Sequence, residues 1–193
     1  MPFFYGGNLI NFLKVSERHW FIVNGVIASI FFLSSVFSPD HPLHEGLAQR
    51  QTNGNTKVFF SQVQFQRDLI GSELGLSQTS NLAYGPVQPI QMVSSTQNGG
   101  LWAGVGFYNE IPLHEDAFLG FYFLPGIYEK FNEVDLGGWL MFRSGIEVGK
   151  TIGKNWTISL AYDHRSSGDL WAYNPGMETW QLVLGKKFGE THN

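Results

Sequence analysis

The sequence predicts an all-β fold: an eight-stranded antiparallel transmembrane β-barrel preceded by an N-terminal signal or anchor segment. Charged residues make up only 15% of the 193 residues, whereas aromatic residues make up 16% and glycine occurs 23 times. Mean hydropathy is nevertheless only −0.08, so the apolar residues must alternate with polar ones rather than form long blocks. Segments with a two-residue apolar period recur along the chain, as expected for strands that have one polar and one apolar face.

The composition also excludes several classes of protein. The length suits one domain. The chain has no cysteine, so it has no disulfide, no thiolate nucleophile and no zinc–thiolate site. Twelve basic against sixteen acidic residues give a net charge of −4, which argues against a nucleic-acid partner, because such a partner requires a basic surface.

Residues 1–37 are predicted to be a signal peptide or an anchor. Seventeen uncharged residues, 21–37, follow Lys14 and Arg18, which is the layout of a secretory signal. A single membrane-spanning helix is the alternative, and seventeen residues are at the lower limit for crossing a bilayer. Cleavage and export are favoured over a permanent anchor.

A polar segment follows and is rich in Pro, Gly and Asn. We interpret residues 38–56 as a linker, and we expect His41 and His44 within it to bind no metal. The barrel domain is then expected at 57–188 and a short tail at 189–193.

Eight segments of the barrel domain fit strands. They are 57–65, 69–78, 87–95, 101–109, 117–124, 139–150, 154–166 and 178–188. The clearest is 154–166, whose apolar face carries Trp156, Ile158, Leu160 and Tyr162 and whose other face is small and polar. In 139–150 the polar face carries Arg143 and Glu147, which we expect to pair inside the barrel.

Alternation alone fits a soluble sandwich as well as a membrane barrel. Export, polar faces without large core residues, and aromatic residues at the ends of the apolar faces favour the membrane barrel. An ordinary aromatic core in a soluble β protein remains the alternative. With about ten residues per tilted strand, residues 49 onward suit eight strands, and a barrel of that size is filled by side chains.

Three residues at one rim have the chemistry of an acyl-transfer site. His164 and Ser166 share one strand face. Glu178 opens the next strand, and the loop 167–177 brings it to the same end. An imidazole that accepts the serine proton, held by a carboxylate, makes serine a nucleophile. Alternatively, the three are ordinary polar residues at the membrane interface.

The segment 163–178, DHRSSGDLWAYNPGME, resembles the outer-membrane lipid A 3-O-deacylases of the PagL type, also called acyloxyacyl-hydrolase-like. Their signature is H-x-S-N, followed by a loop with Asn and Gly and by a Glu fourteen residues after the His. His164 and Glu178 have that separation, and Ser166 stands at the nucleophile position. Phe142, twenty-two residues before His164, matches a family Phe.

The resemblance implies a serine esterase that removes an ester-linked acyl chain, expected at the 3-O position, from lipid A of lipopolysaccharide. Ser166 would be the nucleophile, His164 the general base and Glu178 its orienting group, on the lipid-facing wall of an eight-stranded barrel. Phe142 would face the substrate. No cofactor or metal is implied. The partners would be lipid A and the outer membrane, and a homodimer is left open.

One position departs from the family pattern. The family Asn after the nucleophile is Ser167 here, so the oxyanion is expected to be held by Ser167 or by the backbone N–H of Gly168. Losing an oxyanion donor costs about 10²–10³-fold in rate. Arg165 and Asp169 could contact sugar or phosphate groups, or simply face water.

Two other functions remain open on the sequence. One is a non-catalytic outer-membrane barrel with a structural or adhesive role. The other is a soluble exported β-barrel that binds a lipophilic ligand.

Overall fold

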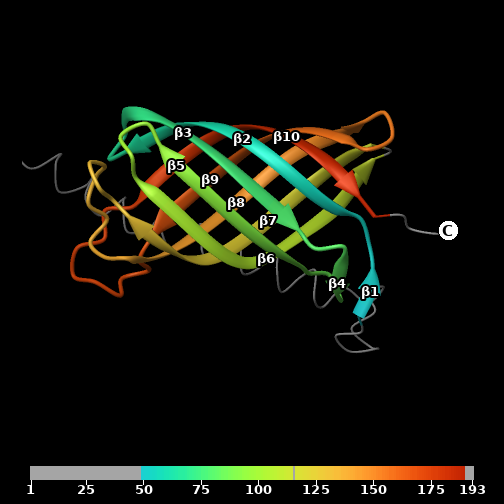
Figure 1. The fold of residues 1–193 in the computed structure, drawn as a ribbon, viewed down its shortest axis with the longest axis horizontal. Coiled ribbons are helices and arrows are strands. Elements are labelled where there is room, and N and C mark those ends of the chain that lie inside the picture. The colour runs from blue at the N-terminus through green and yellow to red at the C-terminus, as the bar shows by residue number, and fades with distance from the viewer. Residues whose placement is uncertain (1–48, 115, 190–193) are drawn as a thin grey trace, which may run out of the picture.

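The computed structural model describes residues 49–114 and 116–189, and eight of its strands form one closed barrel (Figure 1). Every neighbouring pair is antiparallel, in the order β10-β2-β3-β5-β6-β7-β8-β9. The barrel strands are β2 (Gly54–Phe65), β3 (Asp68–Thr79), β5 (Gln88–Thr96), β6 (Leu101–His114), β7 (Ala117–Glu129), β8 (Leu140–Ile152), β9 (Trp156–Ser166) and β10 (Met177–Phe188). The predicted eight-stranded antiparallel barrel is confirmed.

The observed strands differ from the expected ones mainly in length. We expected the strands now labelled β6 and β7 to end at residues 109 and 124, but their ladder continues from Leu101↔Glu129 to His114↔Ala117. A strand's length is set by the partner that satisfies its backbone, which local polarity does not reveal.

Two short strands were not predicted. β1 (Gln49–Gln51) pairs with β4 (Leu82–Tyr84) beside the barrel. β1 and the start of β2 lie within the range 38–56 that we interpreted as a linker. The expected signal or anchor, the first part of that linker and residues 190–193 of the expected tail lie outside the described residues. No helix within the described part of the chain is long and apolar enough to cross a membrane.

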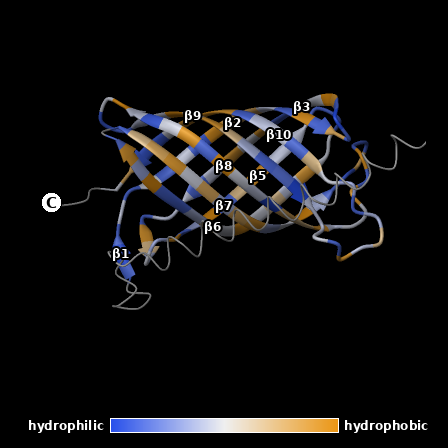
Figure 2. Ribbon diagram, turned by 180° about the vertical axis from the view of Figure 1, so that it is seen from behind, coloured by the Kyte–Doolittle hydropathy of each residue, from blue (hydrophilic) through white to orange (hydrophobic). Residues whose placement is uncertain are grey.

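The outer wall of the barrel is apolar. Outward side chains near the middle of the barrel strands are 40–66% exposed, among them Phe60, Leu74, Val93, Val105, Ile127, Val148, Ile158, Leu160, Leu182 and Leu184. Figure 2 shows the resulting alternation of apolar and polar residues along the strands. A soluble barrel would bury these side chains, whereas a bilayer solvates them. The arrangement is therefore that of a membrane barrel and not of the soluble alternative.

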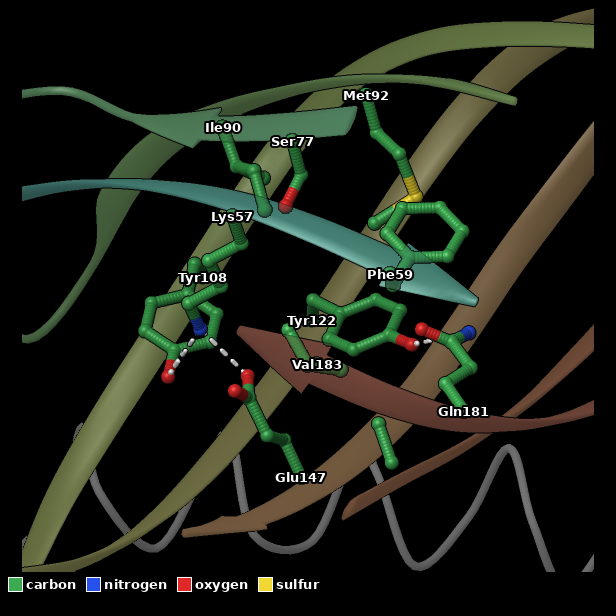
Figure 3. Close-up of a pocket in the computed structure, with 11 residues that line it drawn as sticks. Lys57, Phe59, Ser77, Ile90, Met92, Tyr108, Tyr122, Glu147, Gln181 and Val183 are labelled. Atoms are coloured by element: carbon green, nitrogen blue, oxygen red, sulfur yellow. Dashed lines mark hydrogen bonds and ion pairs between the residues drawn. The ribbon is translucent and has the colours of Figure 1, made fainter. Parts of the chain in front are cut away.

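The interior is filled by polar and charged side chains mixed with aromatic ones. Lys57 Nζ lies 2.6 Å from Glu147 Oε2 and also donates to the hydroxyl of Tyr108 (3.2 Å), both visible in Figure 3. Arg143 is fully buried and pairs with Asp163 and Glu73. The expected Arg143–Glu147 pair is therefore wrong, because closure of the barrel brings each charge to a different strand.

The two ends of the barrel carry different connections. At the end where β9 stops, β2 and β3 are joined by the tight turn of Gln66 and Arg67, both with positive φ (50° and 76°). The same end carries the ten-residue connections 130–139 and 167–176. The opposite end carries the start of β2 and the end of β10. His164, Ser166 and Glu178 therefore lie at the end of the barrel that is far from the first residue of β2 and the last residue of β10.

Candidate active site

β9 and β10 bring His164 and Glu178 together on the outer wall. The two residues are direct cross-strand partners, and Nδ1 of His164 lies 3.7 Å from Oε1 of Glu178. The side chains are 12% and 34% exposed, respectively. On the same strands Leu160 and Trp180 are exposed, while Asp163 and Thr179 are fully buried. The outward direction expected from alternation is therefore what the structure has.

Ser166 is the last residue of β9, two positions beyond His164. It has the outward parity of His164, yet it is only 6% exposed, because it lies where the wall meets the loop 167–176. Its cross-strand partner on β8 is Phe142. The three residues expected to be catalytic and Phe142 therefore lie on three adjacent strands at one end of the barrel.

Phe142 forms an aromatic floor beside Ser166. Its ring stacks on Phe123 of β7, with ring centroids 5.7 Å apart and an interplanar angle of 12°. Gly168 lies over this ring, since a Cβ atom built there would be 3.3 Å from Cδ2 of Phe142. Gly168 also has φ of +61°, a conformation that favours glycine. The backbone after the nucleophile position can therefore approach the ring closely.

Asn174 holds the chain that follows Ser166. The N–H of Ser167 donates to Asn174 Oδ1 (2.9 Å), and Asn174 Nδ2 donates to Asp169 Oδ1 (3.0 Å). The N–H of Leu170 also donates to the carbonyl of Ser167 (3.3 Å). Sequence reasoning gave Asn174 no role, although asparagine and aspartate side chains commonly bind loop backbone. The backbone N–H of Ser167 therefore already donates its hydrogen bond to Asn174.

The side chain of Ser167 has a different environment. The residue is fully buried, and its hydroxyl has no hydrogen-bond partner among the described residues. A buried hydroxyl of this kind keeps its donor available for a ligand.

The suggested contact between Arg165 and a sugar or phosphate group is wrong. Arg165 is 1% exposed, faces the barrel interior, and donates to Glu73 Oε1 (2.6 Å). Its position one residue from His164 gives it the opposite face of the strand. Asp169 is exposed in the loop and has φ of +62°.

The loop 130–139 packs closely against the loop 167–176. A Cβ atom at Gly137 would lie 1.7 Å from the carbonyl oxygen of Tyr173, and one at Gly138 would lie 2.0 Å from Nε1 of Trp171. Only glycine permits these approaches. Within the first loop, hydrogen bonds from Lys130 and from the N–H of Gly137 hold the pKa of Asp135 below its ordinary value.

Comparisons with known proteins identify the family. The family model of the lipid A 3-O-deacylase PagL matches residues 63–187. A search of curated protein sequences finds no match. Among solved structures, the crystal structure of the outer-membrane enzyme PagL has a TM-score of 0.54 and 12% identity, covering 68% of this chain and 98% of that one.

Other solved barrels are similar in fold. A designed transmembrane β-barrel has a TM-score of 0.53 and 7% identity, covering 72% of this chain and 98% of that one. Ail of Yersinia pestis has a TM-score of 0.48 and 13% identity, covering 72% of this chain and all of that one. At 7% and 12% identity, the designed barrel and PagL are similar to this chain in fold alone.

The family match spans β3 to β9 entirely, together with nearly all of β10 and the end of β2, and so includes every residue of the candidate site. It agrees with a closed barrel whose outer wall is apolar and with the resemblance of the segment 163–178. The chain belongs to the PagL family of lipid A 3-O-deacylases, ester hydrolases of the outer membrane.

Proposed function

We propose that this barrel removes the 3-O-linked acyl chain of lipid A with Ser166 as nucleophile, His164 as general base and Glu178 as the group that orients the imidazole. The observation that carries the proposal is the direct cross-strand pairing of Glu178 with His164 on the outward face, with Ser166 two residues further on that face. These are the residue types and the order of contacts that an acyl-transfer triad needs.

The proposal gives the two ring nitrogens of His164 different roles. Nδ1 faces Glu178, so a proton on Nδ1 is held by the carboxylate and Nε2 is left to accept the proton of the Ser166 hydroxyl. The 3.7 Å separation is longer than a hydrogen bond. Such contacts commonly tighten only when substrate is bound.

The reaction then proceeds in two balanced steps. Ser166 Oγ attacks the ester carbonyl while its proton passes to His164, and the alkoxide of the lipid A sugar leaves with that proton. His164 then takes a proton from water as that water attacks the acyl-serine, and it returns this proton to Ser166 Oγ as the fatty acid is released. The hydroxyl of Ser167 and the N–H of Gly168 are the donors proposed for the oxyanion. The N–H of Ser167 is not among them, because it binds Asn174.

The position of the site suits a membrane lipid. His164 and Glu178 lie just beyond the apolar wall that ends in the Tyr162–Trp180 ring pair, with centroids 4.8 Å apart. A lipid in the same leaflet would reach Ser166 by lateral diffusion, with Phe142 against its acyl chain. One barrel carries all the proposed residues, so the homodimer left open by the sequence is not needed for this chemistry.

Mass spectrometry of lipid A from cells that express the wild type or Ser166→Ala tests the proposal. We expect loss of one hydroxyacyl chain with the wild type only, and heat-modifiable barrel in the outer membrane for both. Ser95→Ala is the matched control, because Ser95 is an outward serine at the same end of the barrel but on β5. A Ser166→Ala barrel that still deacylates lipid A would refute the assignment.

A further inference from the structure

Two arginines lie side by side on the inner face of the barrel, behind the candidate site. Arg143 of β8 and Arg165 of β9 are cross-strand partners, and both are buried, with exposures of 0% and 1%. Like charges directly opposite each other on one sheet face are destabilising. Burial removes the water that would screen them.

Glu73 supplies the charge that holds the two arginines together. Its Oε1 accepts from Arg165 Nη2 (2.6 Å), and its Oε2 lies 2.9 Å from Arg143 Nη2. Glu73 belongs to β3, which is separated from β9 by β2 and β10 in the barrel. The carboxylate of Glu73 therefore bridges both guanidinium groups. It comes from β3, which pairs with neither β8 nor β9.

The inward residues around this charge cluster alternate along β9 and β10 with the outward residues of the proposed triad. Asp163 and Arg165 flank His164, and Asp163 Oδ2 accepts from Arg143 Nε (2.6 Å). Thr179, next to Glu178, donates to Asp163 Oδ1 (2.7 Å). The inner side chains thus tie together the backbone of the strands on whose outer face the triad lies.

The pairing of β8 with β9 also places Arg143 close to the backbone that positions Ser166. Arg143 lies between Phe142, the partner of Ser166, and Ser144, the partner of His164. Any separation of β8 from β9 at the arginine pair would therefore displace the nucleophile and the base.

We propose that Glu73 is a positioning residue for deacylation. It holds Arg143 and Arg165 side by side and so keeps β8, β9 and β10 in the register that sets Ser166, His164 and Glu178. The inference rests on the proposed function of that triad. A displacement of about 1 Å in reacting groups costs about 100-fold in rate, so the outer-face chemistry depends on an inner-face carboxylate that no substrate touches.

The test measures activation of Ser166 without lipid A binding. In detergent, an alkyl fluorophosphonate reacts when Ser166 Oγ attacks phosphorus, fluoride leaves, and the serine proton passes to His164. Mass spectrometry of the labelled peptide identifies the modified residue. If the wild type is not labelled, or is labelled elsewhere, the proposed function fails. If Ser166 is labelled, the variants below test Glu73.

Glu73→Gln is compared with Glu147→Gln, which removes the carboxylate of a separate buried interior pair, Lys57–Glu147. Glu147 touches β9 at Ser159, five residues before His164. For Glu73→Gln we expect heat-modifiable barrel that is labelled about 10-fold or more slowly. For Glu147→Gln we expect a rate within about twofold of the wild type.

A second pair of variants covers a failure to fold. Glu73→Asp and Glu147→Asp keep each charge but shorten its reach, so the same contrast is expected between them. Labelling of a folded Glu73 variant at the wild-type rate, or equal slowing in the Glu147 variant, overturns the inference. Absence of folded barrel for both Glu73 variants also overturns it, since Glu73 would then act in folding rather than in positioning.

Discussion

The outer and inner faces of β9 and β10 differ in how tightly their polar residues are held. On the outer face the nitrogen of His164 and the oxygen of Glu178 are 3.7 Å apart, and both side chains are partly exposed. On the inner face, one residue away, Asp163 contacts Thr179 and Arg143 at 2.7 and 2.6 Å without exposure. The same strands therefore combine a loose reactive pair with a rigid support. Four substitutions test this contrast, from the largest expected effect to the smallest.

Glu178→Gln should affect chemistry alone. An amide cannot stabilise the imidazolium that forms on His164, so we expect deacylation to fall about 10²–10⁴-fold with unchanged unfolding in detergent. The measurement is the initial rate of release of the acyl chain from purified lipid A. Glu129→Gln is the control, because Glu129 is an exposed glutamate at the same end of the barrel, on β7. Equal loss in both variants would contradict a specific role for Glu178.

Asp163→Ala should affect the fold first. It removes the partner of Arg143 and Thr179 and also the acceptor for Tyr122 and Gln181. Breaking a buried ion pair from one side costs about 3–5 kcal/mol, measured by urea unfolding in micelles. Ser61→Ala serves as the interior control, because the buried Ser61 hydroxyl has no hydrogen-bond partner among the described residues. A stable Asp163→Ala barrel would show that the inner face is not a support.

Leu160→Arg tests whether the outer wall of the barrel faces lipid. Leu160 is 62% exposed near the middle of β9. A cation facing lipid at the midplane costs about 2–4 kcal/mol, but about 0–1 kcal/mol near the interface. Leu113→Arg, near the end of β6, should therefore destabilise much less. Reconstitution into bilayers followed by urea unfolding measures both, and equal costs would contradict a membrane-spanning wall.

Asp135→Asn should have the smallest effect. Hydrogen bonds from Lys130 (2.5 Å) and Gly137 (2.8 Å) lower the pKa of Asp135, but the pair is exposed to solvent. A lowered pKa stabilises the fold above the ordinary aspartate range, and this contribution disappears as pH falls through the lowered value. We expect a slight loss of unfolding stability at neutral pH, none in strong acid, and unchanged deacylation. A large loss of activity would place this loop in the catalytic machinery.

Much of the candidate site followed from alternation along single strands. Because side chains of a strand alternate between two faces, the sequence predicts that His164, Ser166 and Glu178 share the outer wall. The same rule puts Arg165 inside, so both expectations for Arg165, contact with a sugar or phosphate group and exposure to water, are wrong. Asn174 lacked such a periodic signal, because its role depends on the path of an irregular loop.

The sequence by itself determined the eight strands, their two faces and the end of the barrel at which the site lies, because these depend on local periodicity and chain order. Only the tertiary structure decided which charges meet inside. Glu73 reaches Arg143 and Arg165, and Lys57 reaches Glu147, because closure of the barrel brings together strands that are distant in the chain. The length of β6 and β7 and the β1–β4 pair were decided in the same way, since backbone groups of a strand are satisfied by another segment.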